Sequence, residues 1–114
     1  MSNCLFCKIA AKDIPSEIVY EDEMVFAIKD INPSAPVHIL LIPRKHISSL
    51  NDISLTDESL LGHIQSVAMQ IAREKNLALD GYRLVLNCGS WGGQEVMHLH
   101  YHLLGGRQML WPPG

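Results

Sequence analysis

The chain has 114 residues, the size of one ordinary domain, which leaves no room for a second. Hydrophobic residues make up 47% and charged residues 18%, a composition that supports a packed core and excludes a disordered chain. The formal charge of −3 argues against binding to nucleic acid or to an anionic membrane, and no apolar segment is long enough for a membrane span or a signal peptide, so we expect a cytoplasmic protein.

The N-terminal quarter predicts a short helix followed by a hairpin. Residues 4–12 carry apolar side chains at helical spacing, and Pro15 follows the end of that helix. Ile18–Tyr20 and Met24–Ile28 are rich in β-branched and aromatic residues and are separated by an acidic turn, which is typical of two paired strands.

A loop, a strand and a long helix are predicted next. The prolines of Asp30–Pro36 indicate a loop, and the nearly continuous apolar run Val37–Ile42 indicates a strand that is covered on both faces. Apolar residues then recur at helical spacing, which predicts an amphipathic helix over about Thr56–Lys75. Ser54 or Thr56 can cap its start, and Asn76 can close its end in a left-handed conformation.

Two further strands are predicted at Tyr82–Cys88 and Val96–Leu104, joined by a tight glycine-rich turn and therefore antiparallel neighbours. This order of elements predicts an α+β fold with a helix packed on an antiparallel sheet. The segment Gly105–Gly114 is too apolar for a free tail, so we expect Trp111 to cover a surface, such as that of a second subunit.

His98, His100 and His102 occupy alternate positions of the last predicted strand. Alternate side chains share one face of a strand and lie about 7 Å apart, so the three imidazoles are expected to project on one side. The residues alone leave three readings open: imidazole chemistry, a metal site, or an exposed face that carries histidines.

The three cysteines, an odd number, fit a disulfide framework poorly. Cys4 and Cys7 have the C-x-x-C spacing of half a zinc site, although both thiols could equally be small buried hydrophobes on a helix. Cys88 is expected in the core, and His63 on the exposed face of the long helix.

The segment HLHYHLL at residues 98–104, followed by two glycines, resembles the His-φ-His-φ-His-φ-φ signature of the histidine triad (HIT) superfamily of nucleotide hydrolases and transferases. The likeness extends to FCKI near the start, DINP and APVH in residues 30–38, IPRKHI, GYR, GGQ and the C-terminal RQMLWPPG, and it is greatest to the Hint branch, the nucleoside phosphoramidases. It implies a single HIT domain over residues 1–114, with one long and one short helix on an antiparallel sheet of about five strands that is extended by homodimerisation.

The resemblance also implies an activity, the hydrolysis of purine nucleoside 5′-phosphoramidates and related nucleotide conjugates without a catalytic cofactor. His100 is the expected nucleophile and would form a nucleotidyl-histidine that water then hydrolyses, while His102 and His38 would contact the phosphate or help the leaving group. One alternative is a dinucleoside polyphosphate hydrolase of the Fhit branch, against which the two glycines and the WPPG tail weigh. Another is a nucleotide-binding regulatory module whose slow hydrolysis is incidental.

A nucleotide site follows from the same resemblance. Asp30 is expected to bind both ribose hydroxyls, Asn87 to contact the phosphate, and the Gly92–Glu95 segment to supply backbone amides. Glu95 replaces the serine of some Hint-type members, which leaves the leaving-group preference open, and Trp91 is unusually large for its turn. The whole expected set is Phe6, Ile9, Ile28, Asp30, Ile31, Leu40, Asn87, Gly93, Gln94, Glu95, Val96, His100 and His102, in which Phe6, Ile9, Ile28 and Leu40 wall the purine.

A structural zinc ion is the last implication. Some bacterial HIT proteins that look similar here bind zinc through two cysteines, the histidine of a Pro-x-Lys-His segment and the first histidine of the triad. In this sequence those positions are Cys4, Cys7, His46 and His98. Such a set would tie the N-terminal helix to the sheet, provided that a twist or bulge turns His98 away from the other two histidines.

Overall fold

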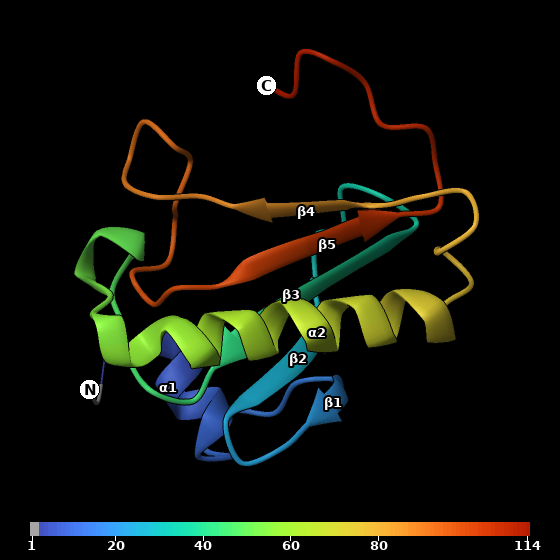
Figure 1. Cartoon of the computed structure of the whole chain (residues 1–114). Helices are drawn as coiled ribbons and strands as arrows, with labels where there is room; N and C mark the ends of the chain where they lie inside the picture. The colour runs from blue at the N-terminus through green and yellow to red at the C-terminus, as the bar shows by residue number, and fades with distance from the viewer. Residues whose placement is uncertain (1–2) are drawn as a thin grey trace.

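Five antiparallel strands form one sheet in the order β1-β2-β3-β5-β4. The computed structural model describes residues 3–114. Figure 1 shows the long helix α2 crossing in front of the strands. The elements are α1 (Leu5–Ala10), β1 (Ile18–Glu21), β2 (Val25–Lys29), β3 (Val37–Pro43), α2 (Glu58–Glu74), β4 (Arg83–Leu86) and β5 (Tyr101–Gly105), with short 3₁₀ turns at Leu50–Asp52 and Leu55–Asp57.

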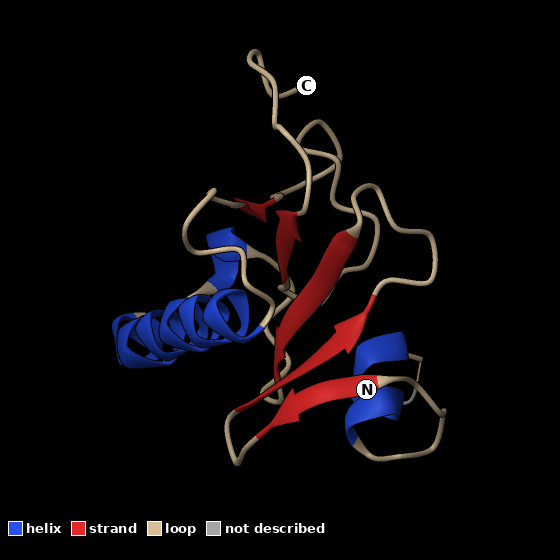
Figure 2. Cartoon of the chain, turned by 90° about the vertical axis from the view of Figure 1, so that its right-hand side faces the viewer, coloured by secondary structure: helices blue, strands red, loops and turns tan. Residues whose placement is uncertain are grey.

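Each face of the sheet has its own apolar cluster. Helix α2 covers one face and packs its apolar stripe on residues such as Ile39 and Leu41, while α1 covers the other face and packs Phe6 against Leu40 and Ile42. Figure 2 shows the two helices on opposite sides of the strands. Successive side chains of β3 enter the two clusters in turn. Its sequence is therefore apolar at nearly every position, as predicted for a strand covered on both faces.

The long helix is confirmed, with bounds two residues shorter at its start and one at its end. The 3₁₀ turn before it is held by the Asp57 carboxylate, which accepts from the Ser54 amide at 2.9 Å and from Lys45 Nζ at 2.6 Å. The helix ends where Asn76 takes a φ of 61°, the predicted left-handed conformation. No helix of residues 3–114 is long and apolar enough to cross a membrane.

The prediction of a strand at Val96–Leu104 was wrong in its start, because β5 begins only at Tyr101. The Leu99 amide donates to the Ile47 carbonyl at 2.6 Å, so the preceding segment is bonded to the loop after β3 rather than to β4. The predicted strand at Tyr82–Cys88 is likewise shortened to β4. A long loop, residues 87–100, therefore replaces the predicted tight turn.

His63 and Cys88 also differ from their predictions, since both are half-buried. His63 Nε2 lies 2.7 Å from Asp22 Oδ2, which also accepts from the Tyr20 hydroxyl at 2.6 Å, so this histidine links α2 to the β1–β2 hairpin. Burial raises the pKa of the Asp22 carboxyl, but hydrogen bonds from Tyr20 and His63 outweigh it and hold that pKa well below its usual range.

Candidate functional site

A cavity of about 490 Å³ opens on the sheet face that carries α1. Two loops approach it: residues 30–36, which lead into β3, and residues 87–100, which lead into β5. Its lining consists of Phe6, Asp30, Asn32, Ser34, His38, Leu40, Asn87, Gly93, Glu95, Val96, His100 and His102.

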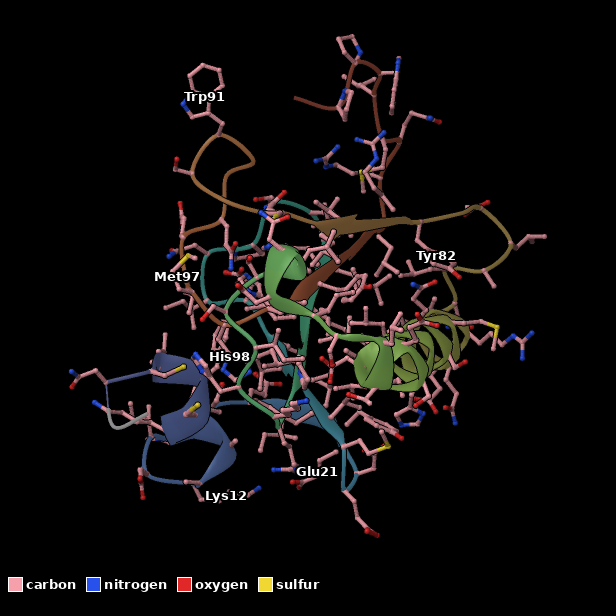
Figure 3. The ribbon with its side chains drawn as sticks, turned by 60° about the vertical axis from the view of Figure 1, so that its left-hand side comes forward. Lys12, Glu21, Tyr82, Trp91, Met97 and His98 are labelled. Atoms are coloured by element: carbon pink, nitrogen blue, oxygen red, sulfur yellow. The ribbon has the colours of Figure 1, made fainter. Side chains whose placement is uncertain are left out.

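The histidine row keeps its predicted alternation even though the regular strand starts late. Leu99, Tyr101 and Leu103 belong to the cluster under α2, whereas the intervening histidines face the α1 side. His98 is fully buried beside α1, as Figure 3 shows, and does not line the cavity, while His100 and His102 do. The row is therefore divided between two sites, and the irregular backbone before β5 allows His98 to turn away.

One nitrogen of His100 is left with a free lone pair. Its Nδ1 lies 2.8 Å from the His98 carbonyl oxygen, and because a carbonyl can only accept, Nδ1 carries the proton. In the neutral ring Nε2 is consequently unprotonated. The edge of Phe6 packs against this ring with centroids 5.0 Å apart, which limits its rotation. An oriented imidazole with an unprotonated Nε2 is the form that a nucleophilic histidine needs.

His38 and His102 form a hydrogen-bonded pair, called here the relay, and the Ser34 amide determines which ring nitrogens carry the protons. The Ser34 amide donates to His38 Nδ1 at 3.0 Å, so neutral His38 holds its proton on Nε2. That Nε2–H lies 2.9 Å from His102 Nδ1, which must accept, and neutral His102 is then protonated on Nε2. Burial lowers the pKa of His102 to about 4 and also lowers that of His38, so both rings are neutral near pH 7.

The same proton positions decide against a metal at this relay. Asp30, His38 and His102 do bring three ligand-type atoms together, with Asp30 Oδ2 at 3.4 Å from His38 Nε2. A metal ligand must offer a lone pair, but the Ser34 amide occupies that of Nδ1 and leaves the proton on Nε2. We assign these groups to hydrogen bonding.

The four predicted zinc ligands do come together, on the buried side of α1. Cys4 Sγ lies 3.3 Å from His98 Nδ1, Cys7 Sγ lies 3.4 Å from His46 Nδ1, and the two Nδ1 atoms are 3.1 Å apart. Tetrahedral zinc holds sulfur and nitrogen donors about 3.6 Å apart and two nitrogens about 3.3 Å apart. His98 Nε2 donates to the Pro43 carbonyl at 2.7 Å, which leaves the lone pair on the Nδ1 that faces the other donors. The donor set therefore fits a metal ion.

Four residues predicted to bind nucleotide do not line the cavity. Ile9 and Ile28 lie in the apolar cluster under α1, and the Ile31 side chain is 91% exposed. Gln94 is buried and acts as a brace, meaning that its side chain ties the 87–100 loop to a neighbouring segment. Its amide nitrogen donates to the carbonyls of Ser48 and Val96, and its oxygen accepts from the Gly89 amide. Gln94 therefore stabilises the loop that lines the cavity without lining the cavity itself.

Two residues of the lining were missed, Asn32 and Ser34. Both contribute a backbone amide to a site side chain, since the Asn32 amide donates to Asp30 Oδ1 at 2.8 Å and the Ser34 amide to His38. Their signal was present in the proline-flanked DINPSAP loop, because a rigid loop aims its free amides.

A family model and a curated protein both match most of the chain. The family model described as "Scavenger mRNA decapping enzyme C-term binding" matches residues 3–111. The chain is 50% identical over 105 residues to the purine nucleoside phosphoramidase of Escherichia coli K12, covering 92% of this chain and 88% of that protein.

Solved structures agree with the family match. A HIT family hydrolase from Legionella pneumophila has a TM-score of 0.97 at 54% identity, covering 98% of this chain and all of that one. A zinc-bound histidine triad family protein from Mycobacterium smegmatis has a TM-score of 0.82 at 33% identity, covering 93% of this chain and 76% of that one.

Proposed function

The chain belongs to the histidine triad family of nucleotide hydrolases, and from this premise we propose that it hydrolyses purine nucleoside 5′-phosphoramidates and related nucleotide conjugates. The name of the Escherichia coli relative supports this substrate class. The observation that carries the proposal is the oriented His100 ring, whose unprotonated Nε2 shares a cavity with His102 and Asp30.

The proposed reaction has two steps. His100 Nε2 attacks the α-phosphorus, the phosphorus–nitrogen bond breaks, and the leaving amine takes the proton that neutral His102 holds on Nε2. Water then attacks the nucleotidyl-histidine, one of its protons returns to His102, and the nucleotide and free His100 are released. The Asn87 side chain and the Gly93 amide are proposed donors to the phosphoryl oxygens, on which negative charge develops.

The nucleoside itself is proposed to lie toward the other end of the cavity. Asp30, which is held by the Asn32 amide, would accept hydrogen bonds from both ribose hydroxyls. Phe6, Leu40 and Val96 supply the apolar wall for the purine. Ile9 and Ile28 support that wall from beneath, because they pack in the same apolar cluster as Phe6 and Leu40.

The charge of the cavity favours phosphoramidates over dinucleoside polyphosphates. Its lining contains two carboxylates, Asp30 and Glu95, and no lysine or arginine. A polyphosphate adds several negative charges that nothing in this lining neutralises, whereas a phosphoramidate carries one.

We therefore expect kcat/KM for adenosine 5′-phosphoramidate to exceed that for diadenosine tetraphosphate by at least about 100-fold, the factor that about 2.7 kcal/mol provides. Product release followed by chromatography measures both. A ratio near one, or a preference for the polyphosphate, would favour the Fhit-like alternative. Binding of AMP without turnover of either compound would favour the regulatory module.

A structural zinc ion held by Cys4, Cys7, His46 and His98 is the second part of the proposal. The converging donors support it, as does the zinc-bound relative from Mycobacterium smegmatis. When bound, zinc would cross-link α1 to the segment before β5 and to the loop after β3. Catalysis is assigned to the histidines of the cavity and needs no metal.

A homodimer that works in the cytoplasm completes the proposal. Strand β4 lies at the edge of the sheet, and its free backbone groups can pair with a second copy. The C-terminal tail leaves the body on the β4 side (Figure 1), and its Trp111 is 81% exposed. Both features support a subunit contact there. Sedimentation equilibrium at micromolar concentration should give the mass of two chains, and the mass of one would contradict the dimer.

A further inference from the structure

The loop of residues 31–36, which leads to His38, has little backbone structure of its own. Within the part of the chain that the structure describes, no backbone–backbone hydrogen bond outside the helices and strands involves these residues. The Asp30 amide closes the base of the loop by donating to the His38 carbonyl at 3.0 Å. Ala35 is buried, and the other loop residues are exposed. The position of the loop therefore depends on hydrogen bonds that involve side chains.

Arg107, which follows β5, binds this loop from another part of the chain. Its Nε and Nη2 both donate to the Ser34 carbonyl oxygen, at 3.3 Å and 3.0 Å. Its Nη1 donates to the Gln108 carbonyl at 3.2 Å, which helps to hold the guanidinium in that orientation. Among the described residues, these are the only hydrogen bonds that residues 31–36 receive from outside the segment 30–38. Charged donors also form stronger hydrogen bonds than neutral ones.

A second contact brings the same tail against the loop. Val37 pairs with Gly105, so the tail leaves β5 directly beside the end of the loop. Gly106 then takes a φ of 92°, and a Cβ added there would lie only 2.9 Å from the Cβ of Pro36. The tail and the loop therefore lie in close contact, and the hydrogen bonds of Arg107 belong to a packed junction.

The residue that Arg107 binds is also the residue that orients the relay. Ser34 offers its carbonyl to Arg107 and its amide to His38 Nδ1, so holding the carbonyl keeps the amide aimed at the ring. His38 then donates from Nε2 to His102 Nδ1, which leaves the His102 proton on Nε2. A continuous series of hydrogen bonds thus connects Arg107 with the proton that the proposed reaction gives to the leaving amine.

We propose that Arg107 is a positioning residue, which keeps the relay in the arrangement that lets His102 protonate the leaving amine. The inference rests on the proposed function and assigns Arg107 a part in it. Arg107 does not line the cavity and acts only through Ser34. Without it, the Ser34 amide can move away from His38 Nδ1, and both rings of the relay can then carry their protons on Nδ1. In that arrangement His102 Nε2 has no proton to give.

Two conjugates of AMP that differ in their need for a proton test this role: the phosphoramidate of butylamine and the 4-nitrophenyl ester. The amine must leave with a proton, whereas 4-nitrophenolate leaves as the anion. We expect Arg107→Ala to lower kcat/KM for the phosphoramidate about tenfold more than for the ester, part of the roughly 10²–10⁴-fold that general acid catalysis contributes. Taking the ratio of the two substrates within one variant cancels any loss of nucleotide binding.

Two further variants show whether the effect belongs to the Ser34 contact. Arg107→Lys keeps the charge and one possible donor, so its ratio should lie between those of wild type and Arg107→Ala. Arg83 also binds the tail, since its Nη2 donates to the Leu110 carbonyl at 2.7 Å, but it does not contact the loop. Arg83→Ala should therefore keep the wild-type ratio. Equal losses on both substrates in Arg107→Ala would overturn the assignment, because a purely structural role predicts them.

Hydrogen exchange of the Ser34 amide, followed by NMR, gives a test that needs no activity. Arg107→Ala should speed this exchange at least about tenfold, because the loop then opens more often, and Arg83→Ala should not. An unchanged exchange rate in Arg107→Ala would overturn the inference. If the wild type cleaves neither substrate, the proposed function fails, and the exchange rate still decides whether Arg107 holds the loop.

Discussion

His100→Ala should lower the turnover of adenosine 5′-phosphoramidate by at least about 10³-fold, because it removes the cavity-lining imidazole whose Nε2 is unprotonated and which is the proposed nucleophile. Neither neighbouring histidine of the cavity can replace it. His38 Nδ1 already accepts from the Ser34 amide, and His102 Nδ1 accepts from His38. Initial rates at saturating substrate measure the loss.

Two controls separate lost chemistry from lost structure. His100 packs against Phe6 and is buried, so the alanine variant is also expected to melt at a lower temperature, and its binding of AMP should be measured beside its rate. His63 lies on α2, which covers the sheet face opposite the cavity, and it contacts Asp22. His63→Ala should therefore keep turnover while losing stability. Residual activity of His100→Ala above a few per cent of wild type would rule out His100 as the nucleophile.

Loss of the proposed zinc ion is expected to have the second-largest effect. Cys4→Ser with Cys7→Ser should reduce bound zinc from one equivalent to less than about a tenth, since two of four donors are gone. We expect the midpoint of thermal unfolding to fall by about 10 °C, because the cross-link that fixes α1 to the sheet is lost. Native mass spectrometry reports the zinc, and calorimetry reports the unfolding.

The proposed zinc ligands and His100, the proposed nucleophile, are joined through two residues. His98 offers its ring to the metal group and its carbonyl to His100, and Phe6, between the two cysteines in sequence, contacts both histidine rings. The double serine variant should therefore also raise KM and lower kcat, each by about tenfold, since misplacement of reacting groups by about 1 Å can cost 10²-fold. Cys88→Ser, which alters a half-buried thiol outside the group, should retain zinc, stability and rate. Wild-type protein purified without chelators that holds less than a tenth of an equivalent of metal would contradict the zinc proposal.

Patterns that repeat along the chain were readable from sequence. Helix α2 was predicted because its apolar residues recur once per turn, and β3 because it is buried on both faces. The alternation of the triad also survived the late start of β5, because Leu99 and Leu103 need the core under α2 on the opposite side.

Contacts between distant segments were not readable in this way. The start of β5 depends on the Leu99–Ile47 hydrogen bond, and Gln94 became a brace because its amide reaches Ser48, 46 residues away. His63 is half-buried because its ring contacts the Asp22 carboxylate, 41 residues away in sequence. None of these pairings has a local sequence signal, so only the three-dimensional structure assigns them.

The covalent intermediate is tested most directly by intact-protein mass spectrometry of wild type and His100→Ala, quenched with acid within milliseconds of mixing with adenosine 5′-phosphoramidate. The wild type should gain the mass of one adenylyl group per chain, transiently and before substrate is exhausted, and His100→Ala should gain none. Full turnover by the wild type with no adduct at any quench time, together with an active His100→Ala variant, would show that water attacks the phosphorus directly.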